Sequence, residues 1–189
     1  MSRTIAAVST PYGKGGIAVI RLSGDKAITV AEKMFFPVSG RALSSVKSGS
    51  AVYGRIVSQG NVIDDGIAVI YRNPHSYTGE DTVEISCHGG ILITQRVLET
   101  AFDCGAVPAE RGEFTKRAFI NGKIDLTEAE AVIGLIDADS EEKLRLCVSH
   151  TQGVLKRRSE EIYREISGLL SAGYGQIDYP EVDLSDLTS

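Results

Sequence analysis

The chain has 189 residues, of which 42% are hydrophobic, and this is enough for one folded core or for one domain with an appendage. The net charge is −5 and Trp is absent, which argues against a broadly basic nucleic-acid binder and against a wide base-stacking platform. Three widely spaced cysteines without a C-x-x-C pair predict reduced thiols in a cytoplasmic protein and no metal site. No apolar stretch is long enough to span a bilayer, and the N-terminus does not resemble a signal peptide.

The first 120 residues alternate between strand-like and helix-like patterns. Strand-like runs bounded by turn residues lie at 4–8, 17–22, 50–57, 62–71 and 82–86. The turn SQGN joins the third and fourth runs into a hairpin. Ser23 and Asp25 can cap a helix over residues 27–35, and a second helix is expected over 91–102. This mixture predicts a compact α+β domain over residues 1–120.

Residues 121–189 have a helical character instead. Thr127 as N-cap, with Glu130 three residues later, predicts a capping box at a helix start. From 140 to 171 there is no Pro and apolar residues recur every three or four positions, which predicts one long amphipathic helix. Its seam is formed by Leu144, Val148, Thr151, Leu155, Ile162, Ile166 and Leu169. The chain then ends in an acidic segment without a strand pattern, IDYPEVDLSDLTS.

The segment NPHSYTGEDTVEISCHGG, residues 73–90, places a carboxylate in the middle of a strand that runs into a glycine turn. Cys87 and His88 are adjacent in this strand, so their side chains point to opposite faces and cannot form a nucleophile–base pair. We therefore expect a buried cysteine beside a histidine of the turn. His75 and His150 are expected at the surface.

Two glycine-rich stretches do not fit known nucleotide-binding loops. A phosphate loop requires G-x-x-x-x-G-K-[ST], but Gly follows Lys14 and Ile follows Lys123. GKGG also differs from the dinucleotide fingerprint, so a tight loop between strands is its simplest interpretation. The segment 111–123 leaves two alternatives, a solvated basic face or an anion site beside a helix start. Its basic residues are Arg111, Lys116, Arg117 and Lys123.

Several of these stretches occur in the order found in one family. They are TIAAVSTPYGKGGIAVIRLSG, PHSYTGEDTVEISCHGG, RGEFTKRAFINGKIDLTEAEAVIGLIDA and IDYPEVD. Together they resemble the N-terminal part of the tRNA modification GTPases called MnmE or TrmE. The resemblance runs from the start of the chain nearly to its end and is weakest over residues 36–60 and in the long helix, where only the pattern matches.

The resemblance implies a fold and a function. The family's N-terminal domain is similar to the tetrahydrofolate-binding domain of the glycine cleavage T-protein, binds a 5-formyl-tetrahydrofolate-type cofactor and forms a homodimer. A helical domain follows, interrupted by a potassium-dependent GTPase domain that also uses Mg²⁺. With the flavoprotein MnmG, also called GidA, the whole enzyme adds a carboxymethylaminomethyl-type group at the wobble uridine, U34, of certain tRNAs.

The chain stops near the point where the GTPase insertion should begin. We therefore expect 121–189 to be the first part of a truncated helical domain, and the chain to be a fragment or a truncated product. Because it carries no phosphate loop, we expect no GTP hydrolysis by this chain alone and no catalytic residue within it.

The family's folate contacts, carried over by motif, fall on Arg21, Glu84 and Lys123. A pterin edge offers adjacent N–H donors, and an ionised carboxylate such as that of Glu84 only accepts hydrogen bonds. Arg21 and Lys123 would supply positive charge for an anionic ligand. Gly13, Gly15 and Gly16 would allow the backbone to approach the ligand closely.

Two alternatives remain at the level of sequence. Arg21 and Glu84 could form a salt bridge across neighbouring strands without any ligand. The chain could also be an assembly module that dimerises and binds no folate. An independent one-carbon transferase is disfavoured, because the chain is short and lacks a clear acid–base pair.

Overall fold

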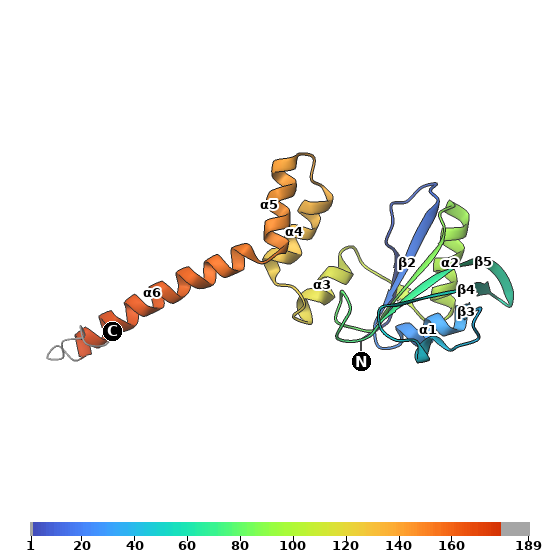
Figure 1. Cartoon of the computed structure of the whole chain (residues 1–189), viewed down its shortest axis with the longest axis horizontal. Helices are drawn as coiled ribbons and strands as arrows, with labels where there is room; N and C mark the ends of the chain where they lie inside the picture. Colours follow the sequence, from blue (N-terminus) through green and yellow to red (C-terminus); the bar gives the residue numbers. More distant parts are fainter. Residues whose placement is uncertain (1, 179–189) are drawn as a thin grey trace. The chain divides into compact units, whose positions relative to one another are not determined.

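The protein is described by a computed structural model that covers residues 2–178 and divides into two compact units after Ile124. The sequence pattern placed this division at residue 120. The acidic segment expected at the end of the chain lies, from residue 179, outside the described residues. Figure 1 shows the helices and strands of each unit.

The first unit contains a seven-stranded sheet with the order β3-β4-β5-β6-β2-β1-β7. All neighbouring strands are antiparallel except β1 and β7, which are parallel. The strands are β1 (Ile5–Val8), β2 (Ile17–Ser23), β3 (Phe35–Pro37), β4 (Ser50–Ser58), β5 (Asn61–Tyr71), β6 (Thr82–His88) and β7 (Val107–Pro108). The expected strands and the hairpin are therefore present, and the short strands β3 and β7 extend the sheet beyond the sequence prediction.

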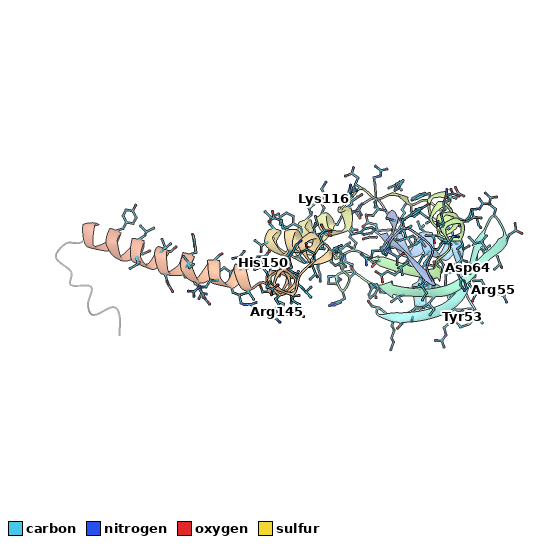
Figure 2. All side chains as sticks on the ribbon, turned by 90° about the horizontal axis from the view of Figure 1, so that it is seen from above. Tyr53, Arg55, Asp64, Lys116, Arg145 and His150 are labelled. Atoms are coloured by element: carbon cyan, nitrogen blue, oxygen red, sulfur yellow. The ribbon has the colours of Figure 1, made fainter. Side chains whose placement is uncertain are left out.

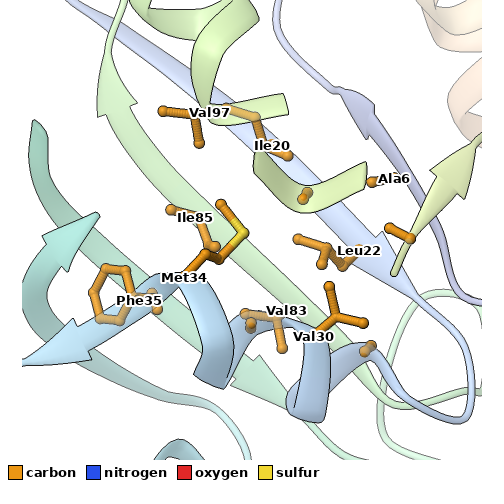
Figure 3. Close-up of a cluster of buried hydrophobic side chains, with 14 of the residues drawn as sticks. Ala6, Ile20, Leu22, Val30, Met34, Phe35, Val83, Ile85 and Val97 are labelled. Carbon is orange, nitrogen blue, oxygen red and sulfur yellow. The ribbon is translucent and has the colours of Figure 1, made fainter. Parts of the chain in front are cut away.

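Two helices of this unit, α1 and α2, pack on one face of the sheet and enclose the core with it (Figure 3). The helices of the unit are α1 (Ala27–Met34), α2 (Ile91–Asp103) and α3 (Glu113–Ile120), together with a 3₁₀ turn, η1 (Leu43–Ser45). The coarse prediction of a mixed domain of strands and helices is confirmed.

The alternation of side chains along β2 and β6 separates the two faces of the sheet. Leu22 and Ile85 are fully buried in the core under the helices. Arg21 and Glu84, one position away in each strand, lie on the opposite face, because successive side chains of a strand alternate. This second face, called the open face below, leaves large apolar side chains exposed in part. They include Ile17 (67%), Tyr53 (55%) and Ile67 (45%). Tyr53 is labelled on the sheet in Figure 2.

The start of α1 differs from the sequence prediction. The N-cap is Lys26, and no side chain caps the helix. Ser23 instead hydrogen-bonds to Thr78 (2.7 Å), and the Asp25 carboxylate accepts a hydrogen bond from the backbone N–H of Ser2 (2.7 Å). Ser23 is the last residue of β2, so its side chain is directed by the strand rather than by the helix that follows.

The second unit contains three helices among its described residues, α4 (Leu126–Ile136), α5 (Glu141–Thr151) and α6 (Val154–Asp178). A helix begins in this region as expected, but the predicted capping box of Thr127 and Glu130 is wrong, because the box is formed by Asp125 and Glu128. Asp125 is the N-cap, its carboxylate accepts from the backbone N–H of Glu128 (2.8 Å), and Glu128 accepts from the backbone N–H of Asp125 (2.7 Å). Thr127 donates its hydroxyl proton to Asp125 and supports the cap.

The prediction of one long helix from 140 to 171 is wrong, because the chain breaks between α5 and α6. Gly153 adopts the left-handed conformation with φ of 69°, and it lies between the end of α5 at Thr151 and the start of α6 at Val154. The apolar spacing continues through the break, so the sequence pattern does not reveal it. Seam residues on both helices are exposed in part within the described structure, including Leu144 (44%), Leu155 (42%) and Leu169 (75%). Within residues 2–178, no helix combines the length and apolarity needed to cross a bilayer.

Candidate ligand site on the open face of the sheet

Arg21 and Glu84 lie opposite each other on β2 and β6. Arg21 donates from Nε to Glu84 Oε1 at 2.7 Å, and Arg21 Nη2 lies 2.7 Å from the same oxygen. Both side chains remain about a quarter exposed, at 26% and 23%. The salt bridge that the sequence allowed between these residues is therefore present, and it is within reach of solvent.

Two aromatic rings flank the Arg21 guanidinium. Its central carbon lies 5.6 Å from the centre of the Tyr77 ring and 5.5 Å from that of Phe114, both within the range of a cation–π contact. The Tyr77 hydroxyl also hydrogen-bonds to Thr115 (2.9 Å), which joins the loop before β6 to helix α3. Neither ring was expected at the site from the sequence pattern, although both lie in the stretches that carry the family resemblance.

Lys123 does not contact this ion pair through any hydrogen bond or ion pair described between residues 2 and 178. Its ammonium donates to the backbone oxygen of Pro74 (3.0 Å), and its stem lies against Gly79, where a Cβ would come within 3.1 Å of Lys123 Cγ. Lys123 thus borders the loop 74–79, which also carries Tyr77. The structure brings Arg21 and Glu84 together and places Lys123 along the loop beside them.

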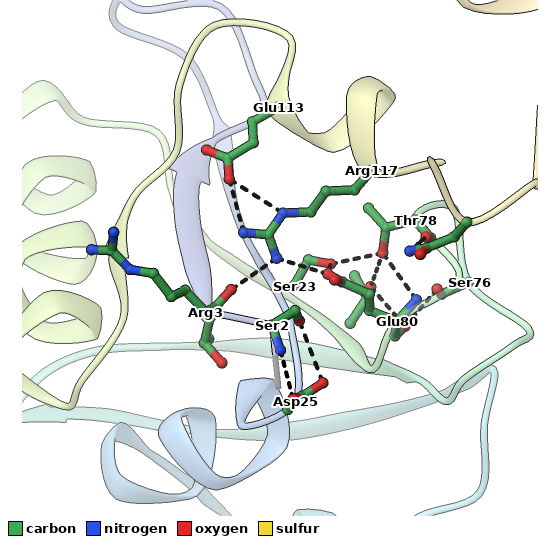
Figure 4. A network of polar contacts seen from close by, with 12 residues as sticks. Ser2, Arg3, Ser23, Asp25, Ser76, Thr78, Glu80, Glu113 and Arg117 are labelled. Carbon is green, nitrogen blue, oxygen red and sulfur yellow. Dashed lines mark hydrogen bonds and ion pairs between the residues drawn. The ribbon is translucent and has the colours of Figure 1, made fainter. Parts of the chain in front are cut away.

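Arg117 belongs to a largely buried polar network (Figure 4). It bridges Glu80 (2.9 Å) and Glu113 (2.8 Å), and its side chain is only 13% exposed. Burial by itself would raise the pKa of Glu113. Hydrogen bonds from the Glu110 backbone and from Arg117 have the opposite and larger effect, so the pKa of Glu113 is lowered. Arg117 therefore holds α3 against the loop before β6. This role is neither of the two alternatives, solvated face or anion site, that the sequence left open for the basic segment.

His88 and Cys87, at the end of β6, have separate environments. Cys87 is buried, and desolvation raises the pKa of its thiol to about 11. The His88 side chain is 71% exposed, and its Nδ1 lies 2.7 Å from Asp64 Oδ1, which raises the pKa of the imidazole. The expectation that these two residues do not form a nucleophile–base pair is confirmed, and His88 is the last residue of the strand rather than part of the turn. His75 is exposed as expected, whereas His150 is half-buried.

These features define a small mixed α/β domain with an accessible ion pair between two aromatic rings, followed by a helical segment. The family described as "GTP-binding protein TrmE N-terminus" matches residues 4–123. The chain belongs to this family.

Similar proteins cover nearly all of the chain. Proteins named "tRNA modification GTPase MnmE" from Symbiobacterium thermophilum and Carboxydothermus hydrogenoformans are 45% and 44% identical to it, over 96% and 100% of the chain. One from Moorella thermoacetica is 46% identical over 94% of the chain. The chain spans only 39% to 41% of the length of these relatives.

Proposed function

We propose that this chain is the folate-binding and dimerising N-terminal part of a tRNA modification GTPase of the MnmE type. The names of its relatives and the family match support this assignment. In the longer protein, GTP with K⁺ and Mg²⁺ would be bound by the GTPase domain, in the cytoplasm. Together with the flavoprotein MnmG (GidA), the whole enzyme would modify U34 of certain tRNAs.

The observation that carries the folate proposal is the geometry of the Arg21–Glu84 pair. Both Arg21 contacts end on Glu84 Oε1, and Oε2 has no hydrogen-bond partner among the described residues. One carboxylate oxygen therefore remains available to accept a hydrogen bond from the N–H edge of a pterin. A charge-assisted bond of this kind is worth about 1.5–3 kcal/mol.

The aromatic rings give the same site a shape suited to a flat ligand. Tyr77 and Phe114 already flank a planar guanidinium in this structure. A pterin is likewise planar and can contact aromatic faces. Lys123, exposed at the neighbouring loop, would supply positive charge for the carboxylates of the ligand.

The assembly-only alternative is favoured by one observation, since the charges of Arg21 and Glu84 already neutralise each other without a ligand. A calorimetric titration of the chain with 5-formyl-tetrahydrofolate separates the two functions. Glu84→Gln keeps the size of the side chain but replaces one acceptor oxygen by a donor, so we expect at least about a tenfold loss of affinity, or about 1.4 kcal/mol.

The matched control is Glu99→Gln, on the exposed side of α2, which should bind folate like the wild type. Circular dichroism of both variants establishes that the fold is retained. Absence of folate binding by the wild-type chain would support the assembly module, and equal affinities of wild type and Glu84→Gln would remove Glu84 from the site.

A further inference from the structure

The open face of the sheet is covered at one end of β2 and β6. Ser23 and Thr82 are opposite each other in these strands, each two residues from Arg21 or Glu84 and on the same face. Ser23 is 0% exposed and Thr82 is 1% exposed. Arg21 and Glu84, in contrast, each keep about a quarter of their side-chain surface in solvent, at 26% and 23%. The ion pair therefore lies at the border between the covered and the open part of the sheet.

The cover over this end is the loop 73–81, which is anchored by buried polar side chains. Thr78 is 0% exposed, and its hydroxyl hydrogen-bonds to those of Ser23 (2.7 Å) and Thr82 (3.3 Å). The Ser23 hydroxyl donates to Glu80 of the same loop (2.7 Å), and Figure 4 shows these contacts around Thr78 and Glu80. The loop is thus bound to the sheet directly beside the ion pair.

Helix α3 is joined to this loop, and the loop and α3 together are called the clamp below. Arg117 lies 2.9 Å from Glu80 of the loop and 2.8 Å from Glu113 at the start of the helix. Tyr77 lies three residues before Glu80 in the loop, and Phe114 directly follows Glu113 in the helix. A single buried cation therefore connects the two segments that carry the aromatic rings of the ligand site.

A second link acts on one of the rings itself. The hydroxyl of Tyr77 shares a hydrogen bond with that of Thr115 (2.9 Å), which is the residue after Phe114. This bond lies at the far end of the Tyr77 side chain, so it restricts both of its torsions. The ring centres of Tyr77 and Phe114 lie 5.6 and 5.5 Å from the guanidinium carbon of Arg21. Thr115 thereby fixes one ring relative to the other and to the cation between them.

We propose that Thr115 and Arg117 are positioning residues of the ligand site, because they hold the two aromatic rings at the spacing that admits a flat ligand. The inference rests on the proposed folate function. Neither residue needs to touch the ligand, since Arg117 is only 13% exposed and Thr115 acts through the Tyr77 hydroxyl. A site that is already ordered loses less conformational entropy on binding. Loosening the clamp should therefore weaken folate binding without removing a group that contacts the folate.

Nuclear magnetic resonance of the ¹⁵N-labelled 189-residue chain tests the positioning without any ligand. Ring currents displace the signal of a proton beside an aromatic ring, so the Nε–H signal of Arg21 reports on the placement of both rings. Thr115→Val keeps the shape of the side chain but removes the hydroxyl, and we expect it to move this signal. Thr115→Ser retains the hydroxyl and should leave the signal near its wild-type position. If Thr115→Val leaves the Arg21 signal unchanged, the proposal is wrong.

Calorimetric titration with 5-formyl-tetrahydrofolate tests the effect on binding. Thr115→Val and Tyr77→Phe should each weaken binding about threefold or more. The double variant should lose no more than either single one, because both substitutions remove the same hydrogen bond. Arg117→Lys keeps the charge but lacks the fork that engages two carboxylates, so it should also weaken binding. Thr100→Val is the control, because it removes a buried hydroxyl that donates to a backbone oxygen of α2 (2.7 Å), and it should bind folate like the wild type.

The possible outcomes separate this inference from the proposed function. If the wild type and Thr115→Val bind folate equally, the positioning role is refuted and the folate proposal stands. Additive losses in the double variant would likewise refute it, since Thr115 would then not act through Tyr77. A wild-type chain that binds no folate would overturn the proposed function instead. In that case a moved Arg21 signal in Thr115→Val would still support the placement of the rings by Thr115.

Discussion

Two nitrogens of Arg21, Nε and Nη2, each lie 2.7 Å from the same carboxylate oxygen of Glu84, Oε1. A bidentate pair would use both carboxylate oxygens, whereas this arrangement uses one. Glu84 is therefore charge-neutralised by Arg21 while it retains an acceptor on the open face. The salt bridge thus leaves one carboxylate oxygen of Glu84 for the proposed folate, so the two roles that the sequence offered for these residues are compatible.

The aromatic flank of this pair gives the first prediction. Phe114→Leu removes a ring next to the Arg21 guanidinium, and aromatic contacts are worth about 0.5–1.5 kcal/mol beyond their buried area. We expect folate affinity to fall about 2- to 10-fold in a calorimetric titration. Phe119→Leu, on the same helix and 43% exposed, is the control and should leave the affinity unchanged. Similar losses in the two variants would show that α3 as a whole, rather than the ring, is responsible.

The buried network around Arg117 predicts a large effect on stability. Arg117→Met leaves Glu80 and Glu113 without their cation, and removing one partner of a buried ion pair costs about 3–5 kcal/mol. We expect the midpoint of urea denaturation to fall by more than about 1 M. Arg96→Met, whose pair with Glu99 is exposed and 3.8 Å long, should change the midpoint little. An equally small shift for Arg117→Met would mean that the network does not hold α3 in place.

The Asp64–His88 pair predicts a pH dependence with a definite sign. The hydrogen bond from His88 to Asp64 raises the folded pKa of the imidazole above its ordinary value of 6.5, and the Asp64 and Asp65 charges act in the same direction. The contribution of the pair to stability is therefore complete below the unfolded pKa and is lost as pH rises through the folded pKa.

Proton NMR titration of the His88 ring checks this prediction. In Asp64→Asn the pKa of His88 should move down towards its ordinary value of 6.5. An unchanged His88 pKa in this variant would show that Asp64 is not its partner in solution.

Strands β1, β2, β4, β5 and β6 could be predicted because alternating or continuous apolar residues carry a local signal, whereas β3 and β7 are too short to show one. Helix 91–102 was likewise expected and is observed as Ile91–Asp103. The break before α6 could not be predicted, since a glycine inside a helical pattern costs only about 1 kcal/mol and the left-handed conformation of Gly153 is not visible in the spacing.

The capping box and the candidate site are two further features that the sequence alone predicts only in part. Asp125–Glu128 and Thr127–Glu130 both satisfy the spacing of a capping box, and only the structure distinguishes them. The pairing of Arg21 with Glu84 follows from strand register, but Tyr77 and Phe114 are brought to Arg21 by a loop and by α3. No local pattern relates residues that tertiary packing alone brings together.

The last prediction concerns self-association, because the open face leaves apolar side chains in contact with water. Tyr53 and Ile67 are opposite each other on β4 and β5 and are 55% and 45% exposed. Burying an apolar side chain of this size is worth about 1.5–3 kcal/mol. A second copy of the chain could cover both residues and their neighbours, so we predict a homodimer in solution that forms through the first unit.

Sedimentation equilibrium of the 189-residue chain at micromolar concentration measures the dimer, and two matched variants locate its interface. Ile67→Lys places a charge in the centre of the exposed apolar patch, where it would be desolvated in the dimer, so we expect a monomer. Ile162→Lys places the same charge on α6, where the wild-type side chain is 46% exposed. This variant should remain a dimer, because its position lies in the second unit. Dissociation by Ile162→Lys alone would assign the contact to the helical seam instead, and a wild-type chain that sediments as a monomer would show that the first unit does not dimerise by itself.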